Sequence, residues 1–515
     1  MTNISTQSLI MLKYWKRRDS MKSQKLVKMA AAGVFMLSLG AGAGAGAGVH
    51  AEGVTKASSS VQPLITAANA QVNIAEVQKM LREVAVQKGI PAEILKAIAY
   101  VETGMMQFNG NGSPIISNDG GIGIMQLTLT PEEISQYNVD VERLKKDTRY
   151  NIEQGADQLL RKWNNSNLPQ VNKHEKEKIE DWYFAVMSYN GLSKRNDPNH
   201  AGGNAYQEKV FQTIRENSLV ELGETPKLDI RYPDASRPEL MTFPAGVDYT
   251  WPTSTKTTQN YKNKAVAYTY NTARSTSNLR DSITDATPEA VLHYTPVEIT
   301  GGPYESGSSI YNQYVFYKVK GTGFEGYMAS SNLVTSNEIT YFKDVYNKEV
   351  SRAVTFLQTR DTINGYTDGT YRPEVKLLRY HAAKLIVQAL DLKLPAGYKM
   401  KADDMKPGSP GYEYMLIAEA NGIMGAGGKL KPYDPLTRSE MASILVRSFG
   451  DTYNQPPAGY HFAGIAPFHP NRTDISKLAY NKITNSVPYN GNNTVDRGQY
   501  ALFLERSVKM KEAKN

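Results

Sequence analysis

Residues 91–103 read PAEILKAIAYVET, and this stretch decides how the first third of the chain folds. Ile94, Ile98 and Glu102 follow one another at intervals of four residues. Side chains four residues apart lie on one face of a helix, so the carboxylate of Glu102 shares an apolar stripe. The pattern predicts a helix over residues 92–103 that carries Glu102 near its C-terminal end.

An acidic side chain on an apolar face is costly unless it is paired or keeps its proton. The other charges of this helix, Glu93 and Lys96, fall off the apolar stripe. Burial raises the pKa of a carboxyl group, and a general acid acting near neutral pH needs a raised pKa. Glu102 is therefore a candidate acid for cleaving a glycosidic bond. The alternative is a structural glutamate that is capped, or paired with an arginine, where the helix ends.

Further motifs follow Glu102 in a characteristic order. They read SNDGGIGIMQ at 117–126, NIEQGADQL at 151–159, AVMSYNG at 185–191 and AY at 205–206. With Glu102, they resemble the lytic transglycosylase family of the lysozyme superfamily, over about residues 72–217. The resemblance implies an all-helical lysozyme-like catalytic domain.

The resemblance also implies roles for individual residues. Glu102 would be the single acid and base, and side chains from the other motifs would line the sugar groove. The implied substrate-binding residues are Thr103, Ser117, Gly123, Met125, Gln126, Tyr189, Asn190 and Tyr206. Two positions depart from the family pattern: Thr103 stands where serine is usual, and no proline closely follows Gln126.

The family's reaction is the cleavage of peptidoglycan without water. Glu102 would protonate the oxygen between N-acetylmuramic acid and N-acetylglucosamine, and would then take a proton from the 6-hydroxyl. The product would be a 1,6-anhydromuramoyl end. A hydrolytic muramidase is the first alternative, because Asp119 in the adjacent loop could orient a water. The second is a non-catalytic surface-layer or wall-binding protein whose lysozyme-like domain only grips glycan.

The C-terminal part of the chain contains an internal repeat. Arg379, Arg438 and Arg497 are 59 residues apart, and each precedes an apolar helical run. Asp344 and Asp404 are 60 residues apart. Three copies at one spacing predict a repeated helical unit.

These repeats resemble S-layer homology motifs through FKDV at 342–345, INGYTDGTYRP at 363–373 and LTRSE at 436–440. The resemblance implies one α-helical, pseudo-threefold domain that binds an anionic secondary cell-wall polymer. An arginine at the first turn of a helix suits a carboxylate, because its fork adds to the positive helix end. The expected polymer-binding residues are Asp344, Arg379, Asp404 and Arg438. The alternative for each arginine is an ion pair between repeats, for instance with Asp344 or Glu440, and Arg497 is left out because its repeat is degenerate.

Residues 247–337 have the β-rich pattern of a small all-β module. NTARSTSNLR at 271–280 and FEGYMASSNL at 324–333 resemble the two ends of a bacterial SH3-like barrel. The implied function is binding of wall peptides, and a spacer with a filled core is the alternative.

The N-terminal residues have the pattern of a secretory signal peptide. A basic segment from Met21 precedes an apolar run at 29–39 and a stretch of small residues up to Ala51. The apolar run is too short to cross a bilayer, which takes about 20 residues. Residues 1–51 are therefore predicted to be a cleaved signal peptide, and residues 52–71 and 218–246 are predicted to be linkers.

Composition limits the remaining possibilities. The chain has 515 residues, no cysteine and a formal net charge of +8. The absence of cysteine excludes disulfides, thiolate metal sites and a cysteine nucleophile, and the charge is too weak to indicate nucleic acid. The seven histidines show no metal-ligand spacing, so no metal or cofactor is expected.

The sequence therefore predicts a secreted multidomain protein of the cell wall or S-layer of a Gram-positive-type envelope. Its expected parts are the catalytic domain at 72–217, the barrel at 247–337, and repeats at 340–399, 400–458 and 459–515. Its expected partners are peptidoglycan glycan strands and the wall polymer, with no membrane span after signal cleavage.

Overall fold

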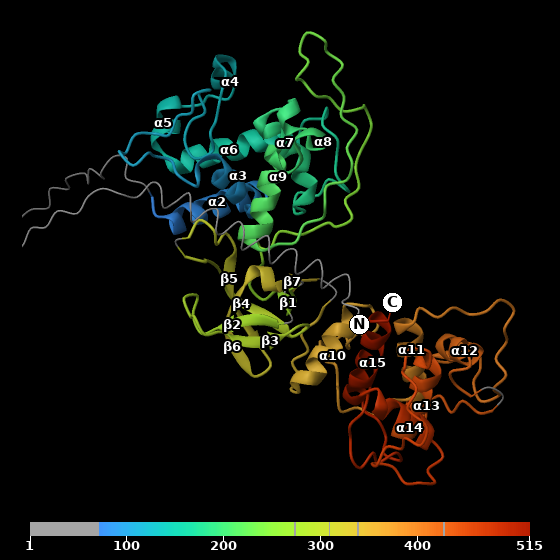
Figure 1. Cartoon of the computed structure of the whole chain (residues 1–515). Coiled ribbons are helices and arrows are strands. Elements are labelled where there is room, and N and C mark those ends of the chain that lie inside the picture. The colour runs from blue at the N-terminus through green and yellow to red at the C-terminus, as the bar shows by residue number, and fades with distance from the viewer. Residues whose placement is uncertain are drawn as a thin grey trace, which may run out of the picture. The chain divides into compact units, whose positions relative to one another are not determined.

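A computed structural model describes residues 72–514, apart from 272–273, 275, 308, 337–338 and 426–427. The predicted signal peptide and first linker lie outside the described residues. Within the described part, no helix is both long and apolar enough to cross a membrane. The colours of Figure 1 follow the chain through a helical region, a β-sheet and a second helical region.

The first region is built from α-helices around one hydrophobic core. The helices are α2 (Ile74–Lys88), α3 (Ala92–Thr103), α4 (Pro131–Gln136), α5 (Val141–Lys146), α6 (Thr148–Trp163), α7 (Tyr183–Asn190), α8 (Pro198–Ala201) and α9 (Tyr206–Thr213). The predicted helix over residues 92–103 is confirmed as α3. It ends at Gly104, whose φ of 64° is the left-handed conformation that glycine adopts readily at a helix end. All side chains of α3 from Ala92 to Ala99 are buried, and Glu102 lies half-buried in the last turn.

Two charged residues of α3 are completely buried, although the sequence pattern placed them off the apolar stripe. The Nζ of Lys96 donates to Glu305 Oε2 at 2.9 Å and to Gln259 Oε1 at 2.8 Å. Glu93 accepts a hydrogen bond from the backbone N–H of Thr258 at 2.8 Å. These partners come more than 160 residues later in the chain, so a local pattern could not reveal them.

The segment predicted as a second linker contributes to the first core. Val220, Leu222, Leu228 and Met241 are buried in it, although residues 219–258 contain no named helix or strand. A segment whose apolar side chains are buried is held by packing. The domain boundaries drawn from the sequence stay predictions.

The β-rich region forms one seven-stranded antiparallel sheet. Its strands are β1 (Val266–Thr269), β2 (Thr276–Arg280), β3 (Glu289–Leu292), β4 (Pro296–Glu305), β5 (Val315–Gly321), β6 (Phe324–Ala329) and β7 (Leu333–Thr335), in the order β3-β2-β6-β5-β4-β1-β7. Register shifts between β4 and β5 at Gly301 and Tyr304 curl the sheet, as bulges do. The edge strands β3 and β7 are four and three residues long and do not pair with each other.

The second helical region contains two main helices for each repeat. They are α10 (Lys348–Gln358), α11 (Arg379–Ala389), α12 (Tyr412–Ala420), α13 (Arg438–Phe449), α14 (Arg472–Tyr480) and α15 (Arg497–Glu512). Helix α11 packs on α12, α13 on α14, and α10 on α15, so each packed pair joins two different repeats. One hydrophobic core runs through all three repeats.

Extended backbone between the helices links the repeats in a ring. Leu436 N donates to Leu377 O at 2.8 Å, Val495 N donates to Leu436 O at 2.8 Å, and Leu377 N donates to Val495 O at 2.9 Å. The three residues are 59 positions apart, so the same contact recurs once per repeat. Isolated β-bridges, such as Leu378 with Pro435 and Thr437 with Thr494, flank this ring.

The fold class predicted from the sequence is wrong. The sheet is a curled, half-closed sheet and not an SH3-like barrel, because its two short edges remain unpaired. The repeat region is not all-α, because extended segments and β-bridges connect its helices. The first region is not purely helical either, since bridges such as Ile122 with Leu127 shape the glycine-rich loop. Only the broader expectation of a mixed chain with several parts is compatible with the structure.

Candidate functional site

Glu102 lies beside two buried tyrosines. The hydroxyl of Tyr206, at the start of α9, donates to Glu102 Oε1 at 2.6 Å. The hydroxyl of Tyr189, near the end of α7, donates to the carbonyl of Met125 at 2.9 Å. The charge of Glu102 adds to burial in raising the pKa of both tyrosines well above the usual value, so both stay protonated and able to donate.

The environment of Glu102 favours its protonated form. Burial raises the pKa of its carboxyl group, and the hydrogen bond from Tyr206 opposes this rise. The charge of Asp119 raises the pKa further, whereas that of Arg195 lowers it. The net direction is upward, as a general acid requires.

Asp119 has the opposite character. It is exposed, and a hydrogen bond from the Ser117 hydroxyl, at 2.5 Å, is the main cause that lowers its pKa. The pKa values of Glu102 and Asp119 are therefore shifted in opposite directions, and such a difference often separates an acid from an electrostatic or basic partner.

The glycine-rich loop is fixed by side chains behind it. Asn151 of α6 accepts from Met125 N at 3.0 Å and donates to the carbonyls of Ile122 and Leu144 at 2.9 and 3.0 Å. Gly123 has a φ of 70°, and a Cβ there would lie 2.4 Å from Asn151 Nδ2. These contacts explain why asparagine and glycine occur at these two positions.

Gln107 also supports the loop, although no sequence motif singled it out. It is buried, accepts from Ile124 N at 2.9 Å and donates to the carbonyl of Lys145 at 2.9 Å. Gly155 of α6 leaves room for Met125, because a Cβ there would lie 2.7 Å from the Met125 side chain.

The remaining predicted groove residues form hydrogen bonds with nearby backbone groups or, for Asn190, with another side chain. The Thr103 hydroxyl donates to the carbonyl of Ile124 at 3.2 Å, and Gln126 Nε2 donates to the carbonyl of Gly123 at 2.8 Å. Asn190 Oδ1 accepts from Asn196 Nδ2 at 3.1 Å. Ser117 accepts from the backbone N–H of Gly121 at 2.9 Å. Their roles toward a substrate stay predictions.

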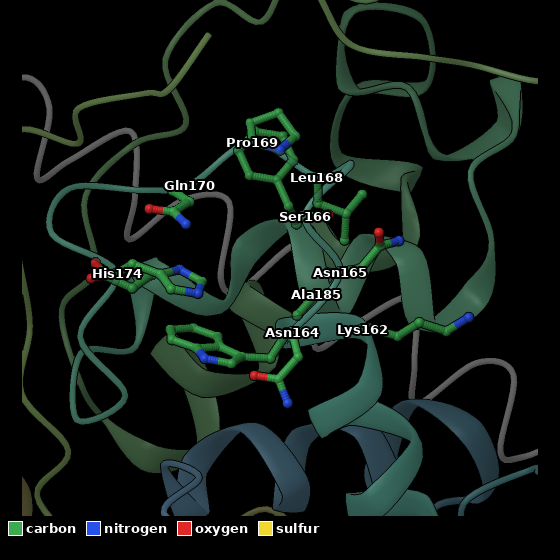
Figure 2. Close-up of a pocket in the computed structure, with 12 residues that line it drawn as sticks. Lys162, Asn164, Asn165, Ser166, Leu168, Pro169, Gln170, His174 and Ala185 are labelled. Atoms are coloured by element: carbon green, nitrogen blue, oxygen red, sulfur yellow. The ribbon is translucent and has the colours of Figure 1, made fainter. Parts of the chain in front are cut away.

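A cavity of about 220 Å³ lies beside the end of α6 (Figure 2). Asn164, Asn165 and Gln170 contribute amide groups to its wall, and none of the predicted site residues lines it. The ring of His174 stacks on Trp163, with centroids 3.8 Å apart. Burial lowers the pKa of His174, so this part of the wall is uncharged at neutral pH.

The three repeat arginines occupy equivalent positions. Each donates its Nε to a backbone carbonyl of another repeat. The bonds run from Arg379 to Leu430 at 2.7 Å, from Arg438 to Tyr489 at 2.8 Å and from Arg497 to Tyr371 at 3.0 Å. The acceptors are again 59 residues apart, so the contact is equivalent in all three repeats. In each arginine the Nε side of the guanidinium is held by this bond.

The neighbours of the other guanidinium nitrogens differ between repeats. Arg379 Nη1 forms an ion pair with Glu440 at 2.7 Å, which is the inter-repeat pairing that the sequence left open. Gln499 lies 59 residues after Glu440 and lines a cavity of about 400 Å³ together with Arg438 and Lys376. Arg438 is 9% exposed, and its Nη2 atom is buried without a hydrogen-bond partner. Among the described residues Arg438 forms no ion pair, and its guanidinium carbon lies 4.7 and 5.6 Å from the ring centroids of Tyr489 and Phe503.

The two predicted aspartates bind backbone. Asp344 accepts from the N–H groups of Tyr371 and Arg372 at 3.0 and 2.7 Å. Asp404 accepts from those of Leu430 and Lys431 at 2.9 and 2.7 Å. They hold the carbonyl-bearing segments that the arginines contact. In the part of the chain that the structure describes, no three acidic or histidine side chains gather as a metal site would require.

The profile of the S-layer homology domain matches residues 341–383 and 403–442. The C-terminal region contains S-layer homology motifs. The resemblance of these repeats is thereby confirmed for the first two. An S-layer homology domain indicates association with the cell wall or S-layer at the cell surface.

Two curated proteins are similar to part of the chain. An amylopullulanase of Thermoanaerobacterium thermosulfurigenes is 29% identical over 167 residues, which are 31% of this chain and 8% of that protein. Exoglucanase XynX of Acetivibrio thermocellus is 32% identical over 117 residues, which are 22% of this chain and 10% of that protein. The matched stretches are thus a tenth or less of either relative and lie over the S-layer homology region.

Proposed function

We propose that this protein is a wall-anchored lytic transglycosylase that cleaves peptidoglycan and leaves 1,6-anhydromuramoyl ends. The observation that carries the proposal is the state of Glu102. Its half-buried carboxyl group has a raised pKa, accepts a hydrogen bond from Tyr206 and lies beside the loop fixed by Asn151. Glu102, Asn151 and Tyr206 all belong to the motifs that resemble those of lytic transglycosylases.

In the proposed reaction, protonated Glu102 donates its proton to the oxygen of the bond between N-acetylmuramic acid and N-acetylglucosamine. The bond from that oxygen to the muramoyl C1 breaks, and the carbonyl of the 2-acetamido group stabilises the cationic carbon. Ionised Glu102 then accepts the proton of the 6-hydroxyl, and the oxygen of this hydroxyl bonds to C1. The Tyr206 hydroxyl steadies the carboxylate between the two steps, because a charge-assisted hydrogen bond is about twice as strong as a neutral one.

A hydrolytic muramidase is the second candidate, and the charge of Asp119 favours it. An exposed carboxylate with a lowered pKa near a carboxyl group with a raised pKa is the arrangement in which one acid donates and the other orients water or stabilises positive charge. The two reactions share the first proton transfer from Glu102. They differ in whether the 6-hydroxyl or water attacks C1.

Anchoring is proposed to depend chiefly on Arg438. Arg438 and Lys376 line one cavity, and Arg438 forms no ion pair among the described residues, so the cavity suits a carboxylate or another anionic group of a wall polymer. Arg379 already forms an ion pair with the carboxylate of Glu440, so an anionic ligand is expected to bind less tightly at Arg379. The expected ligand is an anionic secondary cell-wall polymer.

Release of soluble fragments from purified peptidoglycan tests the proposed activity. The protein without its predicted signal peptide is expected to release fragments, and Glu102→Gln is expected to abolish release while keeping the fold. As a control, the Glu102→Gln protein is expected to sediment together with purified walls, which would show that the substitution leaves wall binding intact. No release by the unaltered protein would favour a non-catalytic wall-binding protein, and release by Glu102→Gln would overturn the role of Glu102.

A further inference from the structure

An arginine that no motif predicted lies beside Asn190, one of the predicted groove residues. Arg195 belongs to the short turn η2 (Lys194–Asn196), which follows α7. Its side chain is exposed, and its Nη2 donates to the carbonyl of Asn190 at 3.1 Å. It is the only hydrogen bond of the guanidinium to residues that the structure describes, and it leaves the other donors of Arg195 to solvent or a ligand.

The turn that carries Arg195 is rigidly tied to the site. Asn196 is buried, and its Nδ2 donates to Asn190 Oδ1 at 3.1 Å and to the carbonyl of Gly191 at 2.8 Å. Its Oδ1 accepts from the backbone N–H of Tyr206 at 3.2 Å. The turn is therefore joined to the end of α7 and to the start of α9, which supplies the tyrosine bonded to Glu102.

The charge of Arg195 reaches both acidic groups of the site. It lowers the pKa of Glu102 and that of Asp119. Among the described residues, Arg195 forms no ion pair: Asp119 accepts from Ser117 instead. An exposed cation that is held in place without a carboxylate partner is suited to bind one from a ligand, since an arginine fork can donate two parallel hydrogen bonds.

We infer that Arg195 binds a carboxylate on the substituent of the muramoyl unit, so that the site prefers acidic glycan strands to neutral ones. This inference rests on the proposed function and names the feature of the substrate that the site recognises. Arg195 is here a specificity residue and takes no part in the proton transfers.

The test uses matched substrates and matched variants of the whole protein. Soluble peptidoglycan strands are compared with the same strands after their carboxylates have been converted to amides. The unaltered protein is expected to lose about 10-fold or more in kcat/KM on the amidated strands, as expected for a lost hydrogen bond to a charged group. Arg195→Gln is expected to cleave both strands at the same reduced efficiency, and Lys194→Gln is expected to keep the preference.

Comparing the two strands within each variant removes any effect of Arg195 on the pKa of Glu102, because that effect is common to both substrates. A preference that survives in Arg195→Gln would overturn the inference. An equal loss on both strands with the preference intact would reassign Arg195 to positioning. If the unaltered protein cleaves neither strand, the proposed function fails and the inference falls with it, a result distinct from the other two.

Discussion

Replacing Asn151 with alanine tests how the glycine-rich loop is held. Asn151 is completely buried and makes three hydrogen bonds, to Met125 N, Ile122 O and Leu144 O. Alanine makes none of them, so Met125 N loses its partner, whereas the carbonyls of Ile122 and Leu144 keep hydrogen bonds from Leu127 N and Gln107 Nε2. The loop that carries Met125 is then free to move away from Tyr189, whose hydroxyl binds the Met125 carbonyl.

The expected loss of stability follows from these contacts. Each buried polar group left without a partner costs about 1–3 kcal/mol. The lost partner of Met125 N therefore gives an expected loss of about 1–3 kcal/mol. Cleavage of peptidoglycan is expected to fall as well, because Met125 and Gln126 lie on the released loop.

Urea unfolding followed by tryptophan fluorescence measures this loss in the relevant part of the molecule. Trp163, Trp182 and Trp251 all lie in the first core, so the signal reports on that core. Gln154→Ala, at a half-exposed position of the same helix, is the control and is expected to change stability by less than about 0.5 kcal/mol. A loss below about 1 kcal/mol for Asn151→Ala, too small even for one unpaired buried group, would refute this account of the loop.

Three further predictions concern Glu102, the anchor and the buried lysine of α3. Tyr206→Phe removes a hydrogen bond that stabilises ionised Glu102, so the pKa of Glu102 rises and the fall of kcat/KM at high pH moves to higher pH. Tyr189→Phe, whose hydroxyl binds a carbonyl instead, is the control, and an unmoved profile in Tyr206→Phe would contradict the assignment. Arg438→Gln is expected to weaken sedimentation with purified walls more than Arg379→Gln does, and the reverse order would contradict the proposed anchor. Glu305→Gln leaves the buried lysine without its counter-charge and is expected to cost about 3–5 kcal/mol of unfolding free energy, whereas unchanged unfolding in urea would show that the pair contributes little.

Local patterns predicted the features that depend on neighbouring residues. The intervals of four between Ile94, Ile98 and Glu102 predicted α3, because a helix repeats its contacts along the sequence. The spacing of 59 residues between Arg379 and Arg438 predicted equivalent positions, and both arginines donate to equivalent carbonyls.

Contacts between distant segments were not predictable from the sequence. The strand order of the sheet depends on which edges meet, and alternation of side chains does not encode that choice. The sequence pattern placed Lys96 off the apolar stripe of its helix and could not reveal its burial, because its partner Glu305 is 209 residues away. Gln107 was missed for a related reason, because it binds backbone groups 17 and 38 residues away. Arg195 was missed because no motif includes it.

The mass of the released sugar end after cleavage in ¹⁸O-labelled water tests the central claim most directly. If ionised Glu102 takes the proton of the 6-hydroxyl and the 6-oxygen bonds to C1, the muramoyl ends are one water lighter than reducing ends and carry no ¹⁸O. Reducing ends that carry one ¹⁸O atom would show that water attacks C1, and would contradict the proposed lytic transglycosylase.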